Sequence, residues 1–87
     1  MKEQMINEKY LNFSFQNTNG VVIKMRMKSD IKIKELLDNY VAKAYSFLGP
    51  KELVFLYNGE QIDRYDQRKV EDYFKPGDSF SISVRET

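Results

Sequence analysis

The side chains available for chemistry in this 87-residue chain are mainly carboxylates and lysines, because the sequence contains no histidine and no cysteine. Without histidine, no side chain has an unperturbed pKa near neutrality, and neither a Ser-His-Asp triad nor a histidine-rich metal site can be built. Without cysteine, disulfides, thiolate zinc sites and cysteine nucleophiles are excluded. Asp38, Glu52 and Asp78 fall on different predicted elements, and no phosphate-loop or calcium-loop motif occurs. We therefore expect a protein that is not an enzyme and has no cofactor.

Composition narrows the classes of partner. A formal net charge of +1 argues against a partner held by bulk electrostatics, so we expect no nucleic-acid binding. The apolar runs are only a few residues long, too short for a membrane span. Residues 1–9 are polar and lack the apolar centre of a secretory signal, so we expect a cytoplasmic or nuclear protein. The length suits one domain at 10–87 after a flexible tail at 1–9.

The first half of the domain predicts a hairpin and a helix. Tyr10–Gln16 alternates with the period of a half-buried strand, 17–20 is a turn, and Val21–Met27 pairs back with its odd-numbered residues inward. Ser29 and Asp30 are good N-cap residues for the helix that follows. Its expected apolar face consists of Ile33, Leu36, Leu37, Tyr40, Val41, Ala44, Tyr45 and Leu48. Gly49-Pro50 should end this helix.

The second half predicts three further strands. An apolar run, Leu53–Tyr57, meets an Asn-Gly pair that favours a tight hairpin turn before a short strand ending at Ile62. Asp63–Lys69 is mixed in charge and is expected to be a solvated loop. A short helical turn within 66–74 is anchored by Val70, Tyr73 and Phe74, residues 75–78 form a turn, and the last strand covers 80–84. This order predicts an α+β fold in which the first and last strands pair in parallel at the centre of a mixed sheet, which is the β-grasp arrangement.

Three segments resemble the SUMO branch of the ubiquitin superfamily. They are the Leu53–Ile62 hairpin, Ile33–Tyr40 at the start of the helix, and Asp78–Ile82 in the final strand. The resemblance extends from Tyr10 to Thr87. It implies a domain that works by being bound or by being attached to other proteins, without catalysis of its own.

The resemblance implies a peptide groove between the second strand and the helix. SUMO domains bind short apolar peptides there, often with acidic flanks, by adding a strand to the sheet edge. The matching positions are Val21, Ile23, Lys24, Arg26, Leu36, Asn39 and Lys43. Lys24, Arg26 and Lys43 would form a cationic rim, whereas Glu35 stands where SUMO usually has a basic residue. The alternative is that Val21, Ile23 and Leu36 belong to the core, and that Lys24 and Arg26 only protect a sheet edge from aggregation.

A second candidate contact is the outward side of the third strand. Val54 and Leu56 are expected to point outward, with Leu56 at the position of the central isoleucine of the ubiquitin patch. The neighbouring outward residues of the last strand are Ser81 and Ser83, so a complete apolar patch is not expected. The two residues are either a small protein contact or isolated exposed apolar side chains.

Three hypotheses for function follow. The first is a non-catalytic ubiquitin-like domain, monomeric when isolated, that docks a protein or a peptide like the motifs SUMO binds. In that case Ile23→Lys or Leu36→Asp should abolish binding without unfolding the domain. The second is a SUMO-like modifier with Gly-Gly after Thr87, since a conjugated tail must thread narrow active sites. The third is an assembly subunit with an interface through Val54 and Leu56.

Overall fold

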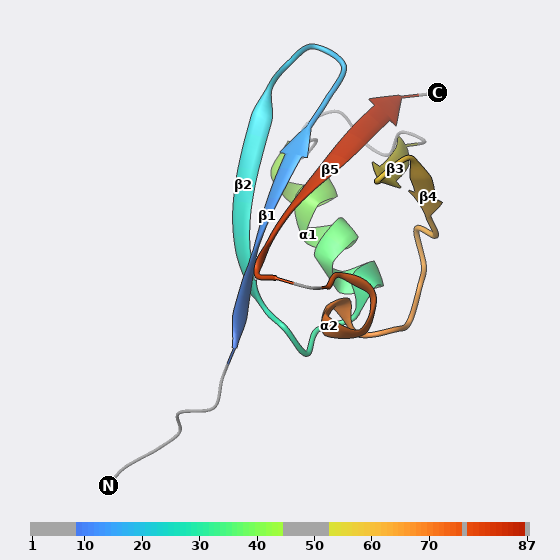
Figure 1. Ribbon diagram of the computed structural model, residues 1–87. Helices are drawn as coiled ribbons and strands as arrows, with labels where there is room; N and C mark the ends of the chain where they lie inside the picture. The colour runs from blue at the N-terminus through green and yellow to red at the C-terminus, as the bar shows by residue number, and fades with distance from the viewer. Residues whose placement is uncertain (1–8, 45–52, 76, 87) are drawn as a thin grey trace, which may run out of the picture.

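The computed structural model describes residues 9–44, 53–75 and 77–86. Five strands form one mixed sheet in the order β2-β1-β5-β3-β4, and the main helix lies across one face of it (Figure 1). The elements are β1 (Tyr10–Gln16), β2 (Val22–Lys28), α1 (Ile33–Ala44), β3 (Leu53–Tyr57), β4 (Glu60–Ile62), α2 (Val70–Tyr73) and β5 (Ser79–Glu86). The chain has the predicted α+β, β-grasp fold, with β1 and β5 parallel at its centre. The predictions for residues 1–8, 45–50, Pro76 and Thr87 lie outside the described residues.

The β1–β2 hairpin follows the predicted alternation with one correction. Leu11, Phe13 and Phe15 are buried, and the side chains of β2 alternate between exposed and half-buried. Val21 does not belong to the strand and is not buried, since it lies in the turn with 53% of its surface exposed. The Asn17 side chain organises this turn by accepting hydrogen bonds from the backbone N–H groups of residues 19 and 21.

The β3–β4 hairpin turns at Asn58-Gly59, as predicted. Both residues have positive φ, 53° at Asn58 and 82° at Gly59, which is the pattern of a type I′ turn. β5 pairs antiparallel with β3 and parallel with β1, and it buries Phe80, Ile82 and Val84 in the predicted alternation.

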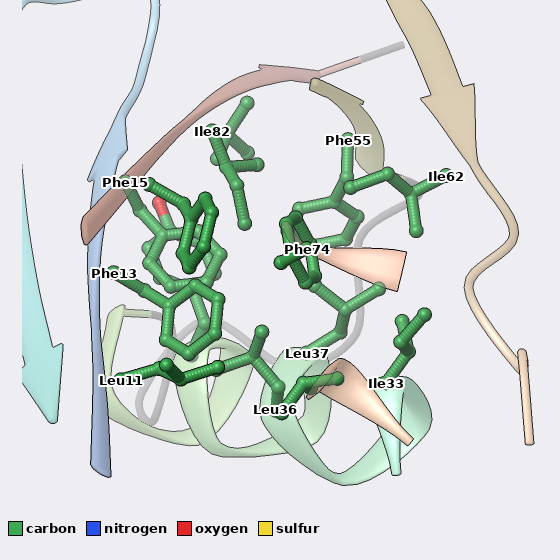
Figure 2. Packing of buried hydrophobic residues seen from close by; sticks show 14 residues of the cluster. Leu11, Phe13, Phe15, Ile33, Leu36, Leu37, Phe55, Ile62, Phe74 and Ile82 are labelled. Carbon is green, nitrogen blue, oxygen red and sulfur yellow. The ribbon is translucent and has the colours of Figure 1, made fainter. Parts of the chain in front are cut away.

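The core fills the space between the inner face of the sheet and α1 (Figure 2). Aromatic rings tie the layers together, because Tyr40 of α1 stacks on Phe15 of β1 at 4.4 Å and meets Phe55 of β3 edge-on at 5.8 Å. The predicted anchors of the short helix are also in place, since Val70 and Phe74 are buried and Tyr73 packs partly against the core. The fully assembled cluster consists of Leu11, Phe13, Phe15, Ile33, Leu36, Leu37, Tyr40, Phe55, Ile62, Val70, Phe74, Phe80, Ile82 and Val84.

The start of α1 is capped by a distant part of the chain, so the prediction of an N-cap at Ser29 or Asp30 was wrong. The backbone N–H groups of Ile33 and Lys34 donate to the carbonyls of Arg68 and Asp66, each at 2.9 Å. We call residues 66–68 the capping loop. They lie in the segment that composition alone assigned to a solvated loop. Ser29 is instead buried, and its hydroxyl donates to Glu71 at 3.3 Å.

A matched pair of substitutions tests the placement of the core. Ile82→Val deletes a methylene at a site that is 1% exposed, so we expect it to lower the free energy of unfolding by about 0.5–1.5 kcal/mol. Ile23→Val makes the same chemical change on half-exposed β2, where we expect a change within about 0.5 kcal/mol. Urea denaturation of both variants measures the difference. Equal losses would contradict the assignment of Ile23 to the margin of the core.

Candidate functional site

The free edge of β2 carries an apolar strip. β2 is the outermost strand on its side of the sheet and pairs only with β1 among the described strands. Its inward side chains Ile23, Met25 and Met27 are half-buried and pack against the outside of the core cluster. Because β1 covers only one of their sides, these three side chains keep part of their apolar surface in contact with solvent.

The flank of α1 that faces this strip follows from helix geometry. Arg64, which follows β4, forms an ion pair with Asp38 at 2.7 Å, so the Asp38 flank of α1 faces the β4 edge of the sheet. At 3.6 residues per turn, Asn39 and Lys43 project from the opposite flank, on the side of β2. We use the name edge groove for the surface formed by Ile23, Met25 and Met27 of β2 with Asn39 and Lys43 of α1, where the resemblance predicts a peptide groove.

Two of the apolar residues predicted for the groove, Leu36 and Val21, lie elsewhere. Leu36, which the resemblance places in the groove, has no exposed surface and lies within the core (Figure 2), in agreement with the alternative interpretation of this residue as core. A buried side chain can contact a partner only after the core opens. Because Leu36→Asp places a carboxylate in the core, it should unfold the domain rather than block binding. Val21 lies in the hairpin turn, outside the strand that forms the groove.

The expected cationic rim is largely absent from the groove. Lys24 and Arg26 alternate with the inward residues of β2, so their side chains lie on the face of the sheet opposite α1. Arg26 covers the ring of Tyr10 on that outer face, with 5.0 Å between the guanidinium carbon and the ring centre. Of the three predicted rim cations, only Lys43 is on the helix side.

Glu35, the departure from the SUMO pattern, has a local structural role. Its carboxylate accepts a hydrogen bond from the backbone N–H of Lys32 at 3.0 Å, just before the first turn of α1. This contact is one half of a capping box and places a negative charge near the positive end of the helix dipole. The neighbouring Asn39 side chain donates to the Glu35 carbonyl at 2.8 Å, so it is held against its own helix.

Val54 and Leu56 lie on the outer face of β3, as predicted, and both are half-buried. Their neighbours on β5 are Arg85 beside Val54 and Ser83 beside Leu56, whereas Ser81 pairs with Ser14 of β1. Among the described residues of β3 and β5, no continuous apolar patch of the ubiquitin kind forms, because polar side chains adjoin both residues.

One ion-pair cluster joins α1 to the segment that follows β4, and a second lies within that segment. In the first, Asp38 accepts from Lys34 at 2.8 Å and pairs with Arg64, and these hydrogen bonds, that of Lys34 foremost, hold the pKa of its carboxyl below the ordinary value. In the second, the guanidinium of Arg68 donates to both carboxylate oxygens of Asp66, which lowers the pKa of Asp66 despite its burial.

Burial has a further effect in this region. It raises the pKa of the Tyr73 phenol, over which the Arg68 guanidinium lies at 5.0 Å.

Among residues 9–44, 53–75 and 77–86, no group of three or more acidic side chains is placed to hold a metal ion. No helix in the described part is long and apolar enough to cross a membrane.

Sequence reasoning missed two parts of this arrangement. Met25 and Met27 were assigned to the core by their alternation, and their contribution to a surface groove depends on β2 lying at the sheet edge. The capping loop was missed because its backbone carbonyls, which any sequence provides, make the contacts with α1. The aspartates at 63 and 66 were a usable signal, since each folds back onto the backbone two residues later.

Comparison with solved structures identifies the fold as ubiquitin-like. A ubiquitin-fold protein from Arabidopsis thaliana superposes with a TM-score of 0.71 at 15% identity, covering 99% of this chain and 92% of the other. The ubiquitin-like domain of Plasmodium falciparum Dsk2 gives 0.67 at 15% identity, with 91% and 100% covered. A structure described as molecular mimicry of SUMO that promotes DNA repair gives 0.65 at 17% identity, with 87% and 90% covered. The sequence matches no protein-family model and no curated protein.

The Asp66–Arg68 pair gives a prediction for acid stability. Because the folded-state pKa of Asp66 lies below its ordinary 3.8, the pair stabilises the domain fully above that value, and this contribution is lost as pH falls through the folded-state pKa. We expect Asp66→Asn to reduce the loss of unfolding free energy between about pH 5 and about pH 2.5. Urea denaturation at each pH measures this loss.

Arg68→Gln supplies the control for this effect. It removes the guanidinium but keeps the carboxylate and the backbone hydrogen bond from residue 68, so the double variant Asp66→Asn/Arg68→Gln should show no further reduction beyond Asp66→Asn alone. Additive reductions in the double variant would mean that Asp66 acts through a partner other than Arg68.

Proposed function

We propose that this chain is a non-catalytic, ubiquitin-like protein-interaction domain that docks a short extended peptide in the edge groove. The observation that carries the proposal is the combination of a free strand edge with the half-exposed side chains of Ile23, Met25 and Met27 on the helix side of it. An open edge supplies backbone hydrogen bonds, and an adjacent apolar strip supplies side-chain contacts.

Strand addition matches the chemistry of this edge. β2 is seven residues long, and within the described sheet its outer backbone N–H and C=O groups have no strand beside them. A peptide that pairs there satisfies these groups and places alternate side chains toward α1. Those side chains would meet methionines, whose flexible thioethers adapt to different apolar shapes. The groove therefore suits a peptide with apolar residues at every second position.

The charges beside the groove are mixed. Lys43 contributes a cation to the α1 flank, whereas Glu35 contributes an anion one turn before Asn39. Acidic flanks of a peptide would thus gain little on the helix side, and apolar contacts and backbone hydrogen bonds would dominate the affinity. The likeness in fold to a ubiquitin-like domain and to a SUMO mimic supports a role in protein binding.

A charge placed in the apolar strip tests the groove. We expect Met25→Glu to weaken binding of a synthetic peptide with alternating valines by at least about tenfold, because a carboxylate would face the peptide's apolar side chains without a partner. The residue is half-exposed, so the variant should stay folded. Isothermal titration measures affinity, and circular dichroism checks the fold.

Val54→Glu is the matched control, since it adds the same charge at a half-buried strand position on the outer face of β3. We expect it to leave peptide affinity unchanged. Backbone amide shifts on peptide addition should cluster at 23–27 and 39–43. If they cluster around Val54 and Leu56 instead, the edge-groove proposal fails and an interface on β3 takes its place.

A further inference from the structure

The outer face of the sheet has a chemistry of its own, separate from the edge groove. A shallow depression there is formed by side chains of β2, β1 and β5, on the opposite side of the sheet from α1. Its outward-pointing members are Asn12, Ser14, Lys24, Arg26, Ser79 and Ser81. They are two cations, three hydroxyls and one amide, which are groups that donate hydrogen bonds to anions.

The register of the sheet orders these groups into two rows. Lys24 lies beside Ser14, which lies beside Ser81, and Arg26 lies beside Asn12, which lies beside Ser79. Each row spans about 10 Å across three strands, and the rows are about 7 Å apart along them. Each row thus has its cation on β2 at the sheet edge and a hydroxyl on β5. The backbone register of the sheet therefore fixes the arrangement of these side chains.

The charge of this face is one-sided. No Asp or Glu occupies an outward position on any strand that the structure describes, although the whole chain carries thirteen acidic residues. Neither Lys24 nor Arg26 forms an ion pair with a carboxylate of the described residues. The hydroxyls of Ser14, Ser79 and Ser81 likewise make no hydrogen bond within this part of the chain. Arg85 adds positive charge at an outward position of β5 on the same face.

We propose that this face, defined by Lys24, Arg26, Ser14 and Ser81 with their row neighbours, binds an acidic segment of a partner protein. An extended peptide repeats its side chains on one side every two residues, about 7 Å apart, which matches the spacing of Lys24 and Arg26. Carboxylates at alternate positions would meet both cations at once, and the serine hydroxyls beside them would donate to the remaining oxygens.

A nucleic acid fits this face less well. Phosphate contacts would suit the cations, but binding of single strands also relies on aromatic side chains on which bases stack. The only aromatic side chain at an outward strand position in the described sheet is Tyr10, and Arg26 already lies over its ring. The net charge of only +1 adds no long-range attraction for a polyanion.

The test uses the whole chain and a synthetic peptide of alternating glutamate and serine. We expect saturable binding, with amide shifts at residues 12–14, 24–26 and 79–81. The double variant Lys24→Glu/Arg26→Glu should weaken binding by at least about tenfold, because two attractive contacts become repulsive. The valine peptide proposed for the edge groove should lose much less affinity in this variant, so the two proposals can fail separately.

Lys32→Glu/Lys69→Glu is the charge-matched control. Both lysines are exposed, they lie opposite each other near the start of α1, and neither belongs to the outer face. Each replacement lowers the net charge by two, so both double variants carry −3 instead of +1. The control should retain acidic-peptide binding within about twofold. Equal weakening by both variants, absence of binding, or tighter binding of oligothymidylate than of the acidic peptide would each overturn the proposal.

Discussion

The parallel pairing of β1 with β5 is the constraint on which the rest of the structure depends. It joins residues 12–16 to residues 79–83, so both ends of the domain meet at the centre of the sheet. A parallel neighbour cannot be reached by a tight turn, and the chain between the two strands must cross over the sheet, which α1 does. β2 pairs with the side of β1 that faces away from β5, and because β3 joins the sheet at β5, β2 is left at the edge. The open strand and the serine-lined rows of the outer face both follow from this pairing.

β2 contributes to two surfaces of different chemistry because successive side chains of a strand point to opposite faces. Its odd-numbered residues are apolar and turn toward α1, and its even-numbered residues Lys24 and Arg26 turn away from it. A shift of one residue in the β1–β2 register would exchange the two sets and expose the methionines on the outer face. The hairpin turn, fixed by the hydrogen bonds of Asn17, protects that register.

The parts of the fold that could be predicted from sequence are those encoded by local patterns. The alternation of Phe80, Ile82 and Val84 predicts β5, and the Asn58-Gly59 pair predicts the β3–β4 turn. The buried face of α1, which ends at Tyr40, follows the helical period. The candidate site was predicted less well, since it depends on which side of the sheet a residue occupies relative to its neighbours. The resemblance to SUMO places both Leu36 and Lys24 in the groove, but Leu36 is core and Lys24 faces away from the helix. The carbonyl groups that cap α1 left no pattern of their own, and only the aspartates at 63 and 66 signalled the turns that place those carbonyls.

The cap of α1 constrains the order in which the parts of the domain can assemble. Helix nucleation is the costly step, and here the first N–H groups of α1 find their partners more than thirty residues further along the chain. The local contact of Glu35 with the Lys32 N–H supports the first turn, but the N–H groups of Ile33 and Lys34 gain their protein partners only when the segment after β4 has arrived. The N-terminal turn of α1 should therefore be a late event in folding and an early one in unfolding. Amide hydrogen exchange at Ile33 and Lys34 would then report on the docking of the capping loop rather than on the helix itself.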